Sequence, residues 1–343
     1  MKTVLEKLAM GQHLSADEMD RAMDSIATGK ADATQIAVFL ALLRAKGETP
    51  LETQALVKVM LRHCHRVDLP ATTKALDIVG TGGDGANTVN LSTAAAVLAA
   101  ACGANVAKHG NRSASSKSGS ADVLEALGVP MLQPEHIAPC IKDAKIAFMY
   151  APHFHPAMKH VMPVRRAMGI RTIFNVLGPL INPASCKHAV IGVYTPSLLP
   201  LFGEVLYGLG VEHALVVHCA GLDELNPIGN ADVVEVSRTK GCTRYTLTPE
   251  ELGIPRCTLK DLEGGDCDLN ARILKDVFRG NCDNPVGHTI AYNAGAGLYV
   301  YGLASSIKEG YEMAKKTLAS GKAMDTLQRW SDVAQNLHKA ASV

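Results

Sequence analysis

The feature that most constrains the fold is a stretch from residue 75 to residue 111, in which two short apolar segments flank a glycine-rich turn and an alanine-rich run. Residues 75–79 are predicted to form a strand, Gly80–Gly85 the turn, and a helix begins near Ser92. A second strand is predicted at 105–109. In open α/β sheets, ligands bind beyond the carboxyl ends of the strands. The stretch therefore predicts an α/β fold with its ligand site at the turn.

The glycine-rich turn has the chemistry of an anion site. Glycine lets the backbone adopt positive φ and approach a ligand closely, and free N–H groups at a helix start attract phosphate. Ser92 and Thr93 can cap the helix, bind a phosphate oxygen or ligate Mg²⁺, and Lys108 supplies a positive charge. The alternative is an ordinary tight turn before a capped helix. The spacing of GTGGDG matches neither the dinucleotide motif GxGxxG nor the P-loop motif GxxxxGK[ST].

Strands and helices alternate from about residue 72, which predicts a mainly parallel sheet with helices on both faces. The predicted strands are 75–79, 105–109, 146–149, 188–193, 213–218 and 231–237. Helices are predicted at 92–102, 120–127, 134–144, 157–168, 197–209, 270–279, 287–303, 306–319 and 321–338. The expected fold is a small N-terminal all-helical domain, residues 1–71, followed by a larger α/β domain, residues 72–343.

The N-terminal segment shows helix starts and no strand pattern. Three capping boxes are predicted in it, each with a Ser, Thr or Asp followed three residues later by Glu or Gln: Ser15 with Glu18, Asp32 with Gln35, and Thr49 with Glu52.

Composition excludes several classes of protein. A net charge of +1 gives no reason to expect a nucleic acid or a membrane surface as partner. The nine cysteines include no CxxC pair, so we expect reduced thiols in a reducing compartment. No apolar run reaches the length of about 18 residues that a membrane span needs. The N-terminus does not resemble a targeting peptide. We therefore expect a cytoplasmic protein, or an organellar one if a transit peptide has been removed.

Two further patterns point to a ligand, and each has a plainer alternative. Asp223 and Glu224 follow the strand predicted at 213–218, where paired carboxylates suit Mg²⁺ held together with substrate phosphates; a solvated turn is the alternative. Residues 111–120 are small and polar, and can form either a plain surface loop or a flap over a phosphate. Lys108 and Lys117 nearby favour the flap.

Three histidines, His153, His155 and His160, suggest a transition-metal site, but Pro152 and Pro156 interrupt the segment and argue against it.

Six motifs in this order closely resemble the anthranilate phosphoribosyltransferase family, over about residues 5–335. They are GTGGD (80–84), NLST (90–93), KHGN (108–111), GSADVLEALG (119–128), HPAMKHVMPVRRAMGIRTIFNVLGPLINP (155–183) and GLDELNP (221–227). The resemblance implies a glycosyltransferase of tryptophan biosynthesis. In its reaction the amino group of anthranilate attacks C1 of 5-phosphoribosyl 1-diphosphate (PRPP) and displaces diphosphate, giving N-(5-phosphoribosyl)anthranilate. It also implies two Mg²⁺ ions per site, a homodimer through the helical domain, and a contribution of residues 163–185 to that domain.

The resemblance also implies the site residues. PRPP is expected to contact Gly80, Gly83, Asp84, Thr88, Asn90, Leu91, Ser92, Thr93, Lys108, His109, Gly110, Asn111, Arg112, Ser113, Ala114, Ser115, Ser116 and Ser120. Anthranilate is expected to contact Gly80, Asn111, His155 and Arg166, with the Arg166 guanidinium on its carboxylate. The metal ligands are expected to be Ser92, Asp223 and Glu224, while Asp84 either orients the turn or supports the ligands. No acid or base is expected, and Lys108, Asn111 and Arg166 serve as positioning groups.

Three alternatives stay open at this point. A pyrimidine-nucleoside phosphorylase would release a base in a phosphate-dependent reaction. A nucleic-acid-binding relative would bind in a salt-sensitive manner without turnover. A transferase for another aromatic acid would prefer an anthranilate analogue.

Overall fold

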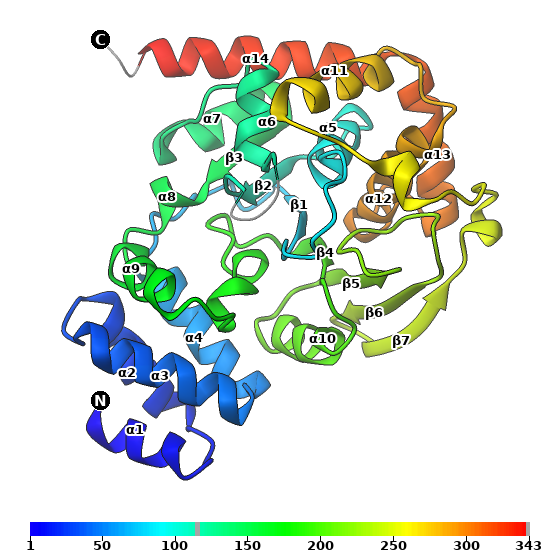
Figure 1. The fold of residues 1–343 in the computed structure, drawn as a ribbon. Coiled ribbons are helices and arrows are strands. Elements are labelled where there is room, and N and C mark those ends of the chain that lie inside the picture. Colours follow the sequence, from blue (N-terminus) through cyan, green and yellow to red (C-terminus); the bar gives the residue numbers. More distant parts are fainter. Residues whose placement is uncertain (114–116, 341–343) are drawn as a thin grey trace.

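The structure, a computed structural model, describes residues 1–113 and 117–340 of the chain. Four helices form the N-terminal lobe: α1 (Lys2–Ala9), α2 (Ala16–Ala27), α3 (Ala33–Lys46) and α4 (Pro50–Arg62), drawn in blue in Figure 1. All three predicted capping boxes are formed, at the starts of α2, α3 and α4. The predicted all-helical N-terminal region is therefore confirmed.

The apolar core of this lobe extends into a later segment. Helix α9 (Met158–Met168) lies against α2 and α3 (Figure 1), and Val161 and Val164 are buried in the same cluster as Met23 and Phe39. The short 3₁₀ turns η1 (Ile173–Asn175) and η2 (Gly178–Leu180) follow, and their apolar side chains belong to this cluster too.

The second part of the chain is built on a seven-stranded sheet with the order β3-β2-β1-β4-β5-β6-β7. Its strands are β1 (Leu76–Gly80), β2 (Val106–Gly110), β3 (Ile146–Tyr150), β4 (His188–Gly192), β5 (His213–Cys219), β6 (Ala231–Ser237) and β7 (Gly241–Leu247). The first five in spatial order are parallel, and β6 and β7 are antiparallel. The predicted mainly parallel sheet is confirmed, with strand β7 as an addition.

Helices cover both faces of the sheet. One face packs against the apolar helices α5 (Leu91–Ala101) and α12 (Pro285–Tyr301), and the other against α10 (Leu198–Gly208). The remaining helices are α6 (Ser120–Ala126), α7 (Pro134–Ala144), α8 (Ala151–Phe154), α11 (Cys267–Phe278), α13 (Ile307–Ala319) and α14 (Lys322–Ala340). The carboxyl ends of the parallel strands point toward the region where α9 and the N-terminal lobe meet the sheet domain (Figure 1).

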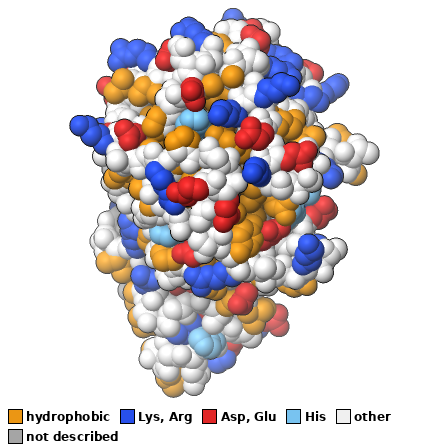
Figure 2. All heavy atoms as spheres, turned by 90° about the vertical axis from the view of Figure 1, so that its right-hand side faces the viewer, with side chains coloured by type: hydrophobic (Ala, Val, Ile, Leu, Met, Phe, Trp, Pro, Cys, Tyr) orange, Lys and Arg blue, Asp and Glu red, His pale blue; other side chains and the backbone are white. Residues whose placement is uncertain are grey.

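Surface charge is mixed on the face that Figure 2 shows. Lysine and arginine side chains alternate there with aspartate and glutamate, and hydrophobic side chains lie between them. The described part of the chain contains no helix with the length and hydropathy that a bilayer crossing requires.

One half-buried polar network makes the stability of the sheet depend on pH. Glu235 on β6 accepts hydrogen bonds from His213 Nε2 at 2.8 Å, Tyr299 Oη at 2.8 Å and Tyr245 Oη at 2.9 Å. The bond from His213 is the largest of the effects that lower the pKa of Glu235 from 4.5 to about 2. A depressed carboxyl pKa stabilises the fold above the unfolded value, and this stabilisation is lost as the pH falls through the folded value.

We therefore expect Glu235→Gln to be less stable than the wild type near neutral pH, and the gap to shrink as the pH falls from 4.5 toward 2. Urea unfolding of both proteins across this range measures the gap. A gap that stays constant down to the acid end would contradict the assignment.

Candidate active site

A large cavity of about 1110 Å³ lies at the carboxyl ends of the parallel strands. Its walls come from the glycine-rich turn, the start of α5, the end of β2, helices α8 and α9, and the loop after β5. This is the edge of the sheet at which α/β proteins bind their ligands. Its volume is large enough for two small-molecule substrates.

Most of the predicted site residues line this cavity, and their roles toward ligands stay predictions. They are Gly80, Gly83, Asp84, Thr88, Asn90, Ser92, Lys108, His109, Gly110, Asn111, Arg112, Ser113, Ser120, His155, Arg166, Asp223 and Glu224. Leu91 and Thr93 are not among the lining residues: Leu91 is buried in the core of the sheet domain, and Thr93 Oγ1 donates to Ser120 Oγ at 3.0 Å. The predictions for Ala114, Ser115 and Ser116 lie outside the described residues.

The glycine-rich turn needs its glycines. Gly82, Gly83 and Gly85 have φ values of +68°, +78° and +78°, a region that side-chain-bearing residues rarely adopt. Helix α5 then begins after Asn90, which makes no side-chain capping bond. The Leu91 N–H donates to the Val89 carbonyl at 2.6 Å, while the next N–H groups of the first turn keep their capacity to bind an anion. The backbone arrangement agrees with the predicted phosphate site.

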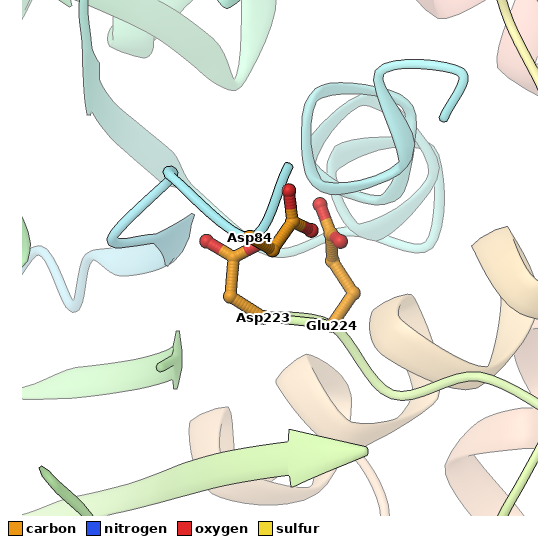
Figure 3. A group of neighbouring side chains, drawn as sticks. All are labelled: Asp84, Asp223 and Glu224. Carbon is orange, nitrogen blue, oxygen red and sulfur yellow. The ribbon is translucent and has the colours of Figure 1, made fainter. Parts of the chain in front are cut away.

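Three carboxylates meet beside this turn. Oxygen atoms of Asp84, Asp223 and Glu224 lie within 4.8 Å of one another, and Figure 3 shows the three side chains turned toward a common space. Burial raises the pKa of Asp223 and of Glu224, and the neighbouring carboxylates raise both further. Glu224 Oε2 is buried and receives no hydrogen bond from the described residues. A divalent cation would relieve this repulsion, so the donor set fits Mg²⁺.

The structure brings Asp84 into one candidate metal-binding group with the predicted ligands Asp223 and Glu224. Asp84 had been expected to orient the turn or to support the ligands; its Oδ1 does accept from the Ala86 N–H at 3.0 Å, but its carboxylate also joins the acidic cluster. Asp223 is held by the Gly82 N–H, which donates to Oδ2 at 2.6 Å. The glycine-rich turn and the loop after β5 are therefore linked directly, across 141 residues of sequence.

Lys108 lies close to this cluster and is fully buried. Its ammonium group donates to the Ile78 carbonyl at 2.5 Å and lies 3.5 Å from Ser92 Oγ. Burial lowers the pKa of Lys108, and the carboxylate of Asp77 opposes that effect most strongly. Asp77 in turn accepts from Asn182 Nδ2 at 2.7 Å. The lysine is thus held in one position beside Ser92, and its role toward a phosphate stays a prediction.

Two histidines, His109 and His155, also line the cavity. The rings of His109 and His155 meet edge to face, with centroids 5.1 Å apart. The His109 Nδ1–H donates to the Gly178 carbonyl at 3.1 Å, while His109 Nε2 and both nitrogens of His155 have no hydrogen-bond partner among the described residues. Burial lowers the pKa of His109 to about 3 and that of His155 to about 4, so both rings are neutral near pH 7.

The structure does not support the alternative of a histidine metal site. His153 Nδ1 instead donates to the Leu132 carbonyl at 3.0 Å. Among residues 1–113 and 117–340, the group of side chains arranged to hold a metal contains Asp84, Asp223 and Glu224 and no histidine.

Sequence reasoning missed Arg171, which lines the same cavity. Its Nη2 donates to the Gly83 carbonyl at 2.6 Å, and its guanidinium lies over the Tyr194 ring, 4.5 Å from the centroid. Arg171 thereby ties the segment after α9 to the glycine-rich turn. The only signal for it in the sequence was its position within the motif GIRTIFN, which does not reveal the contact with Gly83.

Comparison with known proteins agrees with this geometry. A model of the glycosyl transferase family helical bundle domain matches residues 2–64, and a model of the a/b domain of the same family matches residues 72–324. The anthranilate phosphoribosyltransferase of Thermomicrobium roseum is 45% identical over 98% of both chains. That of Chlamydia caviae is 43% identical over 98% of this chain and 97% of its own.

Solved structures show the same likeness. The crystal structure of anthranilate phosphoribosyltransferase from Thermus thermophilus is 42% identical, with a TM-score of 0.91 over 97% of this chain and 99% of that one. The Saccharomyces cerevisiae enzyme in complex with PRPP and Mg is 31% identical, with a TM-score of 0.89 over 98% of both chains. Identity at this level over nearly the whole length shows that the chain belongs to the anthranilate phosphoribosyltransferase family.

Proposed function

We propose that this protein transfers the phosphoribosyl group of PRPP to the amino group of anthranilate and releases diphosphate and N-(5-phosphoribosyl)anthranilate. The observation that carries the proposal is the cavity itself. One cavity is lined by the glycine-rich turn and the acidic cluster and also by Arg166 and Asn111. The yeast relative has been solved with PRPP and Mg, and also with 4-fluoroanthranilate, which supports both substrates.

The donor half of the cavity holds the diphosphate. The backbone of the glycine-rich turn and the start of α5 supply N–H groups, and Lys108 supplies a fixed positive charge beside Ser92. We assign one Mg²⁺ site to Ser92 and a second to Asp223 and Glu224, with Asp84 beside them. When bound, Mg²⁺ neutralises the charge that develops on the departing diphosphate. We propose that two Mg²⁺ ions bind in each active site.

The acceptor half orients the aromatic acid. Arg166 lies on α9, is exposed to the cavity and can bind a carboxylate through two parallel hydrogen bonds. Asn111, at the end of β2, faces the same space. An aromatic amine is already neutral at pH 7, so attack on C1 needs no strong base, and the neutral rings of His109 and His155 agree with this. Catalysis on this side comes from positioning the amine.

We further propose a homodimer formed through the N-terminal lobe. Met10, Val38 and Leu51 lie on its surface with exposed fractions of 66%, 39% and 52%, which are high for large apolar side chains.

All nine cysteines are unpaired, in keeping with a reducing compartment such as the cytoplasm. The comparisons support neither the nucleic-acid-binding alternative nor a different acceptor.

The direct experiment mixes the protein with anthranilate, PRPP and Mg²⁺ and follows the loss of anthranilate fluorescence, with a chelator as the control. Metal-dependent loss is expected. A folded protein that leaves anthranilate unchanged while PRPP stays intact would contradict the proposal. Screens of other aromatic acids and of nucleic acids would then follow.

Arg166→Ala is expected to raise the KM for anthranilate about 10–150-fold, since a hydrogen-bonded charge contributes about 1.5–3 kcal/mol. The KM for PRPP should change little. Arg166→Lys is the matched variant, because it keeps the charge but loses the planar fork, and it should recover only part of the affinity. Steady-state kinetics with each substrate varied in turn measure both constants. An equal rise in both KM values would refute the carboxylate role.

A further inference from the structure

The loop that carries Asp223 and Glu224 has little backbone support of its own. This acidic loop, residues 219–228, begins with a tight turn in which Cys219 and Leu222 exchange backbone hydrogen bonds of 2.9 and 3.1 Å. Ala220 has a φ of +52° and Gly221 one of +85° within that turn. From Asp223 to Asn226, the described residues make no backbone–backbone hydrogen bond. The Gly82 N–H holds the Asp223 carboxylate, so the backbone of this part of the loop must be held by other groups.

Two buried asparagine side chains supply that support. Asn293, on the core helix α12, donates from Nδ2 to the Leu225 carbonyl at 2.7 Å and accepts at Oδ1 from the Leu225 N–H at 3.1 Å. A single side chain thus satisfies both backbone groups of the residue that follows Glu224. Asn293 is 2% exposed and Leu225 is fully buried, so water does not compete for these bonds.

Asn226 braces the same loop from within. Its Nδ2 donates to the Cys219 and Glu224 carbonyls, each at 3.0 Å, and its Oδ1 accepts from the Ile228 N–H at 3.1 Å. It is fully buried. The bonds of Asn226 connect the beginning, the middle and the end of the loop, so the backbone on both sides of Glu224 is held by side-chain amides.

We infer that Asn226 and Asn293 are positioning residues: this amide clamp holds the acidic loop so that the carboxylates of Asp223 and Glu224 converge with Asp84 on one cation. The inference rests on the proposed function, since it concerns the metal site of that reaction. The three clustered carboxylates repel one another, with Asp223 buried and Asp84 and Glu224 half-buried. Glu224 Oε2 receives no hydrogen bond among the described residues that would oppose this repulsion. Without the clamp, the bond from the Gly82 N–H to Asp223 remains, but the backbone around Glu224 can relax and separate the carboxylates.

The test measures metal binding directly. Asn293→Leu keeps the branched shape of the side chain, although with a larger volume, and leaves the Leu225 N–H and carbonyl unpaired. Asn226→Ala is a smaller change that removes the second half of the clamp. Mn²⁺ serves as the probe, and the free ion is measured by electron paramagnetic resonance during titration of each protein. Loss of groups that orient metal ligands typically weakens metal affinity 10–100-fold, and we expect at least about a 10-fold loss for each variant.

Thr289→Val is the matched control. Thr289 is buried on α12 one turn before Asn293, and its hydroxyl donates to the Pro285 carbonyl at 2.7 Å rather than to the acidic loop. This variant loses a buried hydrogen bond on the same helix, so it reports the effect of a general loss of stability. We expect its Mn²⁺ affinity, and its Mg²⁺ concentration for half-maximal turnover, to match the wild type.

Three outcomes decide the matter. Weakened Mn²⁺ binding in folded Asn293→Leu and Asn226→Ala, with Thr289→Val unchanged, supports the clamp. Wild-type binding in both asparagine variants overturns it; if circular dichroism shows Asn293→Leu unfolded, Asn226→Ala alone decides. Asp223→Asn combined with Glu224→Gln separates the two proposals. If that variant still binds Mn²⁺ normally, the metal assignment fails and the clamp fails with it. If it loses Mn²⁺ binding, the metal assignment stands, and the asparagine variants then decide whether the clamp positions the metal ligands.

Discussion

Asp223→Asn combined with Glu224→Gln is expected to lower turnover by about 10²–10³-fold while the protein stays folded. The cation that these residues would hold supplies several kcal/mol of charge stabilisation to the departing diphosphate, and each 1.4 kcal/mol or so corresponds to a factor of ten in rate. The amides keep the size and shape of the carboxyl groups, so packing in the loop changes little. Turnover at saturating substrates and Mg²⁺ measures the loss.

Stability should move in the opposite direction to activity. Burial and mutual repulsion raise the pKa of both carboxyl groups, which means that the ionised cluster destabilises the metal-free fold. Replacing the charges should therefore leave the melting temperature unchanged or raise it. Glu135→Gln combined with Asp143→Asn, at two exposed positions of α7, removes the same net charge far from the cavity and serves as the control. Normal turnover of the Asp223/Glu224 variant at limiting Mg²⁺ would refute the metal site.

The regular elements could be predicted because their signals are local. The glycine-rich turn, the three capping boxes and the buried apolar strands each occupy a few consecutive residues, and the structure places β1 to β6 within two residues of their predicted ends. Strand β7 was missed because its sequence, GCTRYTL, is polar and its side chains are mostly exposed at the edge of the sheet. It pairs with β6 through backbone hydrogen bonds, which do not depend on an apolar sequence.

The parts of the site that escaped prediction are long-range contacts. Asn293 and the acidic loop are 68 residues apart, and Arg171 reaches Gly83 across 88 residues. The sequence does not show whether a single asparagine in an apolar helix, such as Asn293, bonds to a neighbouring residue of its own helix or to the distant acidic loop. Asp84 was recognised as part of the turn, but its distance to Asp223 depends on how two strand ends meet in the sheet. The motifs therefore predicted the cavity and its chemistry, while the supports behind it required the structure.

Gly192→Ala is expected to disable the metal site and to cost about 1–3 kcal/mol of stability, the usual range for overpacking a core. Gly192 and Gly80 are paired in register at the ends of β4 and β1. A Cβ atom on Gly192 would overlap the backbone carbonyl of Asp223, and one on Gly80 would overlap the Asp223 carboxyl group. The two glycines thus form the groove in which Asp223 lies. Gly80, predicted as a ligand contact, has this second role, and Gly192 was not predicted at all.

Because the clash at Gly192 involves backbone rather than a flexible side chain, the acidic loop must shift, and Mn²⁺ affinity and turnover should both fall. Val190→Ala, two residues earlier on β4, separates this effect from a loss of stability. Val190 is buried on the side of α12, and its truncation should cost about 2 kcal/mol by leaving a cavity. Asp223 should not move in that variant, so its metal affinity should be that of the wild type. Gly192→Ala could instead bind Mn²⁺ as tightly as Val190→Ala at equal stability. The acidic loop would then accommodate the added methyl group, and the close fit of Asp223 against β4 would not determine the geometry of the candidate metal site.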